Sequence, residues 1–170
     1  MKSAPQAITR PRLASPLLIA FMVLPALLGA CAQGAARFSA AAAASGPTYE
    51  VQAASIPGLG TVLVNGQGFT LYMFEPDKQG APTCNGTCAV EWPPLLLPAG
   101  VTGPQAGPGV RASLLGTVRR ADGGLQVTYA SWPLYRWNAD VQHGQATGQG
   151  LYNQGGRWYV MGPAGQVVRK

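Results

Sequence analysis

Two stretches of the chain share one pattern, Tyr72-Met-Phe-Glu-Pro-Asp77 and Tyr135-Arg-Trp-Asn-Ala-Asp140. Each begins with tyrosine, carries a second aromatic residue two positions later, and ends on aspartate. A pattern that returns in this way indicates two copies of one structural unit. Neither copy is large enough to bury its own apolar face, so we expect the two to close on each other and share a core.

Two further similarities support a duplication. The tetrapeptide Leu-Gly-Thr-Val stands at residues 59–62 and again at 115–118, and Trp92 has a loose counterpart in Trp158. The tetrapeptides lie closer together than the two motifs do, which predicts extra residues in the hairpin of the second copy. Two such copies would leave a pseudo-twofold seam between them, and this seam is where we expect any functional site.

Length and composition fit one domain with an export segment. The chain has 170 residues, of which 47% are hydrophobic and only 11% are charged. Its formal net charge is +6, but Lys2, Arg10 and Arg12 at the N-terminus supply much of the excess. The remaining field is weak, so the charge does not indicate a nucleic-acid-binding protein.

The secondary-structure signals predict antiparallel strands throughout the body, because short runs rich in Val, Thr, Tyr, Phe and Trp alternate with turn formers. No window sustains the apolar period of a helix. Residues 65–68 (Asn-Gly-Gln-Gly) and 122–124 (Asp-Gly-Gly) are predicted hairpin turns, since these residue types tolerate positive φ. The predicted strands are Tyr49–Ala53, Thr61–Val64, Phe69–Phe74, Gly116–Arg120, Leu125–Tyr129, Leu134–Trp137 and Arg157–Met161.

The aromatic residues of the two motifs are predicted to face the core. Residues two apart on a strand share a face, which places Tyr72 with Phe74 and Tyr135 with Trp137. The opposite face of the second copy carries Leu134 and Arg136, so we expect that side to be partly solvated.

Asp77 and Asp140 follow these strands, where aspartate commonly accepts hydrogen bonds from the backbone N–H groups of a turn. We therefore expect the two aspartates to clamp turns while the tyrosine hydroxyls find partners at the edge of the core. The alternative is a ligand or cation site made by both aspartates across the pseudo-twofold seam, although the body has few acidic oxygens for a calcium cage.

The N-terminus has the order of a secretory signal peptide. Basic residues precede the apolar run Leu17–Leu28, which is followed by small residues. This run has 12 residues, whereas a membrane-spanning helix needs about 20. An uncleaved membrane anchor is the less favoured alternative.

The quartet Leu28-Gly-Ala-Cys31 resembles the lipobox of bacterial lipoprotein precursors. The resemblance implies cleavage before Cys31 and a diacylglyceryl group on its thiol, with the outer membrane as the destination if the host has two membranes. The alternative is ordinary cleavage at Ala30-Cys31-Ala32, which would release an unanchored protein. The small residues that follow are typical of a flexible tether.

The doubled Y-x-[FWY]-x-x-D motif, the stretch C-x-G-x-C-A-x-x-W-P-P-L (Cys84–Leu95) and the segment R-x-D-G-x-x-Q-x-T-Y (Arg120–Tyr129) resemble a family of secreted-repeat bacterial lipoproteins. The similarity runs from about Leu59 to Pro163. It implies location and architecture but no firmly assigned activity. Two turn positions depart from the family pattern, since Ala130-Ser131 replaces a typical Asn-Gly pair and Asn65 replaces a usual aspartate.

With Cys31 set aside as the lipid carrier, Cys84 and Cys88 remain as an even pair in an exported chain, which predicts a disulfide. Bridged Cα atoms lie within about 7 Å, so the intervening residues must form a tight turn, which Asn85-Gly86 can supply. The loop is short, and such a bridge contributes only about 2 kcal/mol. A redox-active pair remains an alternative, although the spacing is not CxxC and no helix is expected to follow.

Several chemistries lack their residues. Covalent haem needs a CxxCH motif, and a blue-copper centre needs two histidines where the chain has only His143. No motif of a serine hydrolase, a phosphate loop or a zinc protease occurs. Cys84 and Cys88 together with Met73 or Met161 could hold a soft ion such as Cu(I), which we keep as a weak alternative.

The sequence therefore predicts an all-β protein in which two related antiparallel repeats pack into one compact sandwich- or barrel-like domain. We expect a lipid-anchored cell-envelope protein that acts as a non-enzymatic binding or structural module without a cofactor or nucleic-acid partner, the membrane being its partner through the anchor. An envelope protein or small ligand is the further partner expected. The alternative is an extracytoplasmic redox or electron-transfer component using Cys84 and Cys88. The expected segments are a signal peptide at 1–30, the lipidated cysteine and tether at 31–48, and the β domain at 49–170, with repeat 1 at about 56–100 and repeat 2 at about 110–168.

Overall fold

A computed structural model describes residues 46–170 of the chain. The expected signal peptide, the lipidation site at Cys31 and residues 31–45 of the expected tether lie outside the described residues. Within the described part, no helix has the length and apolar character needed to cross a bilayer.

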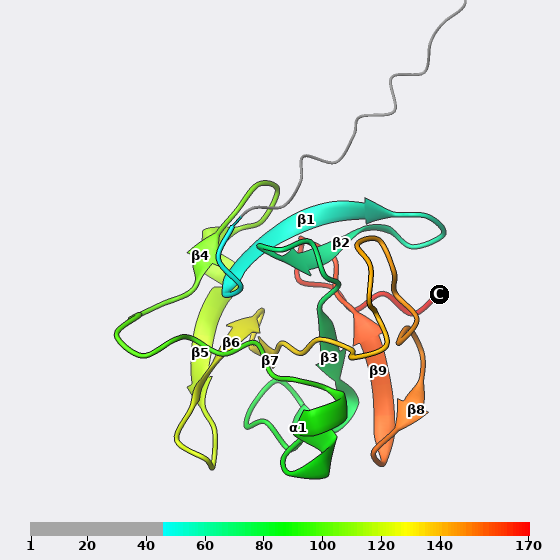
Figure 1. The fold of residues 1–170 in the computed structure, drawn as a ribbon. Coiled ribbons are helices and arrows are strands. Elements are labelled where there is room, and N and C mark those ends of the chain that lie inside the picture. The colour runs from blue at the N-terminus through cyan, green and yellow to red at the C-terminus, as the bar shows by residue number, and fades with distance from the viewer. Residues whose placement is uncertain (1–45) are drawn as a thin grey trace, which may run out of the picture. The chain divides into compact units, whose positions relative to one another are not determined.

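The described residues are built mainly of short strands (Figure 1). One α-helix, α1 (Thr87–Glu91), and two 3-10 turns, Glu75–Asp77 and Ala112–Leu114, interrupt them. The strands are β1 (Glu50–Ile56), β2 (Gly60–Asn65), β3 (Tyr72–Phe74), β4 (Gln105–Ala106), β5 (Leu115–Arg119), β6 (Leu125–Tyr129), β7 (Trp132–Pro133), β8 (Tyr152–Asn153) and β9 (Gly156–Val160).

The strands form three small sheets, with the orders β2-β1-β4, β3-β9-β8 and β5-β6-β7. Every pairing is antiparallel except that of β1 with β4. The predicted all-β fold is confirmed. The prediction of a strand at Leu134–Trp137 is wrong. After the short strand β7, these residues make only isolated β-bridges, at Tyr135.

The two repeats exchange strands around an approximate twofold axis. β3 of the first repeat pairs with β9 of the second, with Tyr72 opposite Val160. In the equivalent place Tyr135 of the second repeat bridges Pro94 of the first. Tyr72 and Tyr135 themselves exchange two backbone hydrogen bonds of 2.9 Å each. The axis therefore passes between the two tyrosines, and each repeat completes the other.

The repeated Leu-Gly-Thr-Val tetrapeptide does not mark equivalent positions. Its first copy enters β2, the second strand of hairpin β1–β2, whereas its second copy lies in β5, the first strand of hairpin β5–β6. Equivalent contacts are made instead by Leu63, which donates to the Met161 carbonyl at 2.8 Å, and by Val127, which donates to the Leu95 carbonyl at 2.8 Å. The tetrapeptide match was therefore wrong, and so were the extra residues that it predicted, because a glycine before β-branched residues begins many strands.

Both predicted hairpin turns are present. The Asn65 Oδ1 atom accepts hydrogen bonds from the backbone N–H groups of Gln67 and Phe69, at 3.1 and 2.9 Å. In the second turn the Asp122 Oδ1 atom accepts the Gly124 N–H at 3.0 Å. These side chains replace backbone acceptors, which is why Asn and Asp favour such positions.

The aromatic faces of the motifs are buried, as predicted. Tyr72, Phe74 and Tyr135 belong to one core cluster, while Met73 on the opposite face of β3 belongs to a second. β3 is thus buried on both faces. In the second repeat Leu134 is wholly buried and Arg136 is partly exposed, so the predicted solvation of that side is confined to Arg136.

The turn between β6 and β7 offers a test of backbone strain. Ala130 and Ser131 connect paired residues and have φ values of 48° and 66°. Side chains other than glycine pay about 1–2 kcal/mol in this left-handed region. We expect Ser131→Gly to raise the free energy of unfolding by about 1 kcal/mol, as measured by urea denaturation.

Gly123→Ala, in the turn between β5 and β6, is the matched control. Gly123 has a φ of 86°, and a Cβ atom added there meets nothing within 4 Å. We expect this variant to lose a similar free energy, because only backbone strain changes. An unchanged or lower stability of Ser131→Gly would contradict the assignment of strain to this turn.

Candidate functional site

The tyrosines and aspartates of the two motifs form a pair of crossed hydrogen bonds. The Tyr72 hydroxyl of the first repeat donates to Asp140 Oδ2 of the second at 2.5 Å. The Tyr135 hydroxyl of the second repeat donates to Asp77 Oδ2 of the first at 2.8 Å. All four residues are buried. The motif therefore ties each repeat to the other, and the hydroxyls lie inside the core rather than at its edge.

Each aspartate also clamps a turn, as predicted. Asp77 Oδ1 accepts both the backbone N–H and the hydroxyl of Thr83, each at 2.7 Å. Asp140 Oδ1 accepts the N–H of Thr147 at 2.9 Å and its hydroxyl at 2.7 Å. The two threonines were missed in the sequence, although each follows its aspartate at a similar spacing. They extend the repeated motif by one functional position.

Burial and charge change the acidity of these groups. Burial raises the pKa of the Tyr72 hydroxyl, and the adjacent Asp140 raises it further. Burial likewise raises the pKa of Tyr135, with a further contribution from the charge of Asp77. Both tyrosines therefore remain hydrogen-bond donors at any physiological pH.

Burial also raises the pKa of the Asp77 carboxyl, while the hydrogen bonds from Thr83 and Tyr135 and the charge of Arg120 oppose this shift. A raised pKa means that the folded protein binds this proton more tightly than the unfolded chain does. The contribution to stability is then fully present below the ordinary value of 3.8 and is lost as pH rises through the folded-state pKa. We expect the free energy of unfolding of the wild type, minus that of Asp77→Asn, to fall across this window.

Asp122→Asn supplies a control of opposite sign for the same denaturation series. The Gly124 N–H and then the Arg120 side chain lower the pKa of the exposed Asp122 carboxyl. Its contribution is present above the ordinary value and is lost as pH falls through the folded-state pKa. Wild type minus Asp122→Asn should therefore rise with pH; two curves of the same sign would contradict the assignment.

A ladder of stacked aromatic rings joins the two repeats. Trp92 and Trp158 stack with centroids 3.8 Å apart and an interplanar angle of 2°. Trp137 stacks on the outer face of Trp92 at 4.2 Å, and Phe74 stacks on Trp158 at 4.1 Å. The loose correspondence of Trp92 with Trp158 is thus confirmed as a structural equivalence, and each motif aromatic stacks on the tryptophan of the other repeat.

The predicted disulfide joins Cys84 and Cys88, whose Cα atoms are 5.2 Å apart. Helix α1 begins at Thr87, inside the predicted turn, so the expectation that no helix follows is wrong. Five residues with no strong apolar period explain why the sequence pattern missed it. Cys84 is 1% exposed and Cys88 is 7% exposed. The bridge is therefore packed in the first core cluster, whereas a labile redox bridge needs access to its thiol partner.

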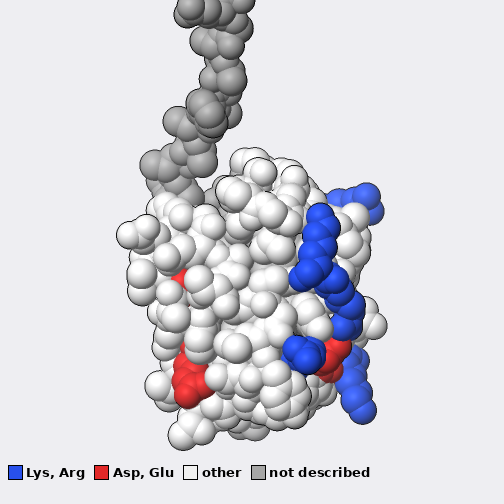
Figure 2. Space-filling view, turned by 90° about the vertical axis from the view of Figure 1, so that its right-hand side faces the viewer, with Lys and Arg blue, Asp and Glu red and all other residues white. Residues whose placement is uncertain are grey.

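Arg120 links the second repeat to the disulfide loop. Its guanidinium donates to the Cys84 carbonyl at 2.9 Å, to Asn85 Oδ1 at 2.8 Å and to Gln126 Oε1 at 2.6 Å. Its neighbour Arg119 is exposed. One arginine of the basic pair is therefore buried and the other is on the surface. Figure 2 shows one face of the molecule, which is largely uncharged and has Lys and Arg side chains along one side.

The residues considered for metal binding do not gather. Cys84 and Cys88 lie in the first core cluster, and Met73 and Met161 lie in the second. Among residues 46–170, no three His, Cys, Asp or Glu side chains form a group that could hold a metal ion. Each carboxylate of the crossed pairs already accepts three hydrogen bonds inside the protein.

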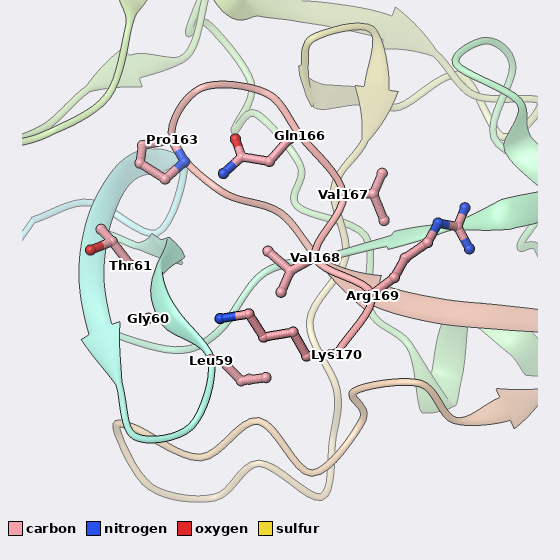
Figure 3. A pocket seen from close by; sticks show the side chains of 9 residues that line it. All are labelled: Leu59, Gly60, Thr61, Pro163, Gln166, Val167, Val168, Arg169 and Lys170. Atoms are coloured by element: carbon pink, nitrogen blue, oxygen red, sulfur yellow. The ribbon is translucent and has the colours of Figure 1, made fainter.

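An open groove of about 510 Å³ lies apart from the repeated motif (Figure 3). Its lining comes from the turn at Leu59–Thr61 and from the C-terminal residues 163–170, with none of the predicted site residues. Arg169 points away from its centre and donates to Glu75 Oε1 at 2.6 Å. The groove therefore contains none of the predicted site residues, although Arg169 of its lining contacts Glu75 in the first motif stretch.

Comparison with known proteins connects this geometry to a family. A family model described as a secreted repeat of unknown function matches residues 54–96 and 116–161, together more than half of the chain. The two matches each contain one copy of the Tyr-Asp motif. Neither a curated protein nor a solved structure matches significantly. The crossed, duplicated strand unit is that family's repeat, and the chain belongs to the family of secreted repeats of unknown function.

Proposed function

We propose that the mature protein is a lipid-anchored component of the cell envelope that acts as a non-enzymatic binding or structural module. One observation carries the second half of this proposal. The polar groups that define the motif are hydrogen-bonded inside the core, to each other and to threonines in turns. These groups belong to Tyr72, Asp77, Tyr135 and Asp140. Their repetition is thus accounted for by folding, and the fold is a scaffold whose exposed surface is free to bind.

The anchor follows from the N-terminal sequence. A basic start and the apolar run Leu17–Leu28 precede the lipobox-like quartet that ends at Cys31. Family membership as a secreted repeat agrees with export. Two or more acyl chains on one residue make a lasting membrane anchor, since each buried methylene contributes about 0.8 kcal/mol. The envelope membrane is therefore the proposed partner of the N-terminus, and the β domain stands in the space beside it.

Intact mass spectrometry of the membrane-extracted protein tests the anchor. We expect the mass of a chain that begins at Cys31, increased by the mass of a diacylglyceryl group. Cys31→Ser should remove the acyl mass and the membrane association without changing the thermal unfolding of the domain. A wild-type mass without acyl chains would overturn the anchoring proposal.

The same sample tests the redox alternative. With the fold intact, mild thiol should leave Cys84 and Cys88 unavailable to an alkylating reagent, because both are buried. When the protein is denatured in the same thiol, the alkylating reagent should add two alkyl groups, one to each of these cysteines. Rapid alkylation of the native protein would instead favour the redox alternative.

A further inference from the structure

Arg136 breaks the symmetry of the two repeats. It follows Tyr135 directly, so its equivalent in the first repeat is Met73, which follows Tyr72. Met73 is 0% exposed and packs in the second core cluster. The fold therefore accepts an apolar side chain at this position. The first repeat therefore folds without a cation at the equivalent position.

The guanidinium of Arg136 lies over an aromatic ring. Its Cζ atom is 4.3 Å from the centroid of the Phe69 ring. The same ring meets His143 edge-on, with centroids 5.0 Å apart and an interplanar angle of 89°. His143 is the single histidine of the chain. Phe69 of the first repeat thus contacts a cation and an imidazole of the second repeat at one place.

Arg136 lacks the partners that a half-buried cation usually has. Its Nε atom is buried and has no hydrogen-bond partner in the described part of the chain. No carboxylate of residues 46–170 lies within ion-pair distance of its side chain. Desolvation by burial lowers the pKa of Arg136, opposed by the charge of Asp140. The oxygens of Asp140 are already taken by Tyr72 and Thr147. The guanidinium therefore has donors to offer and no acceptor among residues 46–170.

We propose that Arg136, Phe69 and His143 form a binding site for a small anionic group, a phosphate or a carboxylate. The planar fork of a guanidinium matches both groups with two parallel hydrogen bonds. The cation–π contact with Phe69 holds the guanidinium in place before the anion binds, and an imidazole N–H of His143 is a second donor. This inference rests on the proposed binding role for its biological meaning, since it names the chemistry that such a module would recognise.

The test is an NMR titration of the full mature protein in a nonionic detergent micelle. The imidazole proton signals of His143 serve as the reporter, because no other histidine contributes. Inorganic phosphate, acetate and micellar phosphatidylglycerol are added in separate series at fixed pH and ionic strength. We expect a saturable shift with at least one of these anions. A response to phosphatidylglycerol alone would identify a lipid headgroup as the source, and a response to free phosphate or acetate would identify a soluble ligand.

Arg136→Met is the deciding variant, because it copies the residue that the first repeat uses at this position. We expect its apparent affinity to fall at least tenfold while thermal unfolding stays at or above the wild-type temperature. Arg136→Lys keeps the charge without the fork and should bind with intermediate affinity.

Arg157→Met is the matched control. Arg157 is an exposed arginine that also lies over an aromatic ring, 5.9 Å from the Tyr152 centroid. Its removal changes the net charge by the same amount and should leave the titration unchanged. Absence of saturation in the wild type, or equal affinity in Arg136→Met, would overturn the site. Either result leaves the mass measurement of the anchor unaffected, so the two proposals fail separately.

Discussion

Replacing Trp158 by alanine is expected to lower the free energy of unfolding by about 3–5 kcal/mol, the range for a large aromatic side chain removed from a core. Trp158 is 0% exposed and stacks between Trp92 and Phe74, with Tyr135 against its edge at 5.2 Å. Its removal leaves a cavity at the twofold axis, where both repeats supply the walls. Surrounding backbone cannot collapse into this space without breaking the exchange of strands between the repeats.

Trp137→Ala provides the comparison. Trp137 carries the same side chain but ends the ladder, is partly exposed and stacks on Trp92 alone. We expect its loss to cost about half as much, since it forfeits one stacking partner and less buried area. Urea denaturation followed by far-UV circular dichroism measures both variants without relying on tryptophan fluorescence. A smaller effect at Trp158 than at Trp137 would contradict the assignment of the core to the axis.

The duplication could be predicted because its motif recurs in the sequence, and much of the strand pattern because it follows from local chemistry. Asn65 and Asp122 fixed the hairpin turns through their own side-chain acceptors. The alternation of Tyr72 and Phe74 along one strand face predicted the aromatic core, and both are buried. The spacing of Cys84 and Cys88 required a tight turn, which is present. Each of these conclusions needs only the residues within a few positions of the one concerned.

The crossing of the repeats could not be predicted, because it depends on which strand pairs with which. Nothing near Tyr72 indicates that its hydroxyl reaches Asp140, because Asp77 is closer in sequence and equally suitable. The same limit explains why the sequence did not predict the burial of Met73, which lies on the face of β3 opposite Tyr72 and Phe74 and packs in the second core cluster. Long-range pairing also explains why the two Leu-Gly-Thr-Val tetrapeptides were wrongly matched as equivalent positions. The sequence of a strand does not show whether it is the first or the second strand of a hairpin.

Arg120 is the second residue whose replacement should cause a large loss of folding free energy. The structure also explains the sequence motif that begins at Arg120. The segment from Arg120 to Tyr129 contains Arg120, Asp122 and Gln126, and the guanidinium hydrogen-bonds both of the other two side chains. It also reaches the other repeat through Cys84 and Asn85. This side chain thus fastens the disulfide loop to the second hairpin.

We expect Arg120→Ala to lower the free energy of unfolding by about 3–5 kcal/mol, because a buried charged group is removed and its acceptors stay behind without donors. The side chain of Arg120 is 1% exposed. Arg119→Ala is the matched control, since the neighbouring arginine is exposed and bonds only the Gly123 carbonyl at 3.0 Å. Its effect should stay within about 0.5 kcal/mol.

A kinetic measurement separates the role of Arg120 in the loop from its role in overall stability. Under native conditions, a mild thiol should reduce the disulfide of Arg120→Ala faster than that of the wild type. The reason is that the Cys84 carbonyl loses its hydrogen-bond donor and the loop opens locally. Ser131→Gly added to Arg120→Ala raises global stability without restoring the loop contact, so the reduction rate should remain high if opening is local. A rate that falls about fivefold in the double variant, as 1 kcal/mol of added global stability requires, would show that reduction follows global unfolding, and that Arg120 does not hold the loop in particular.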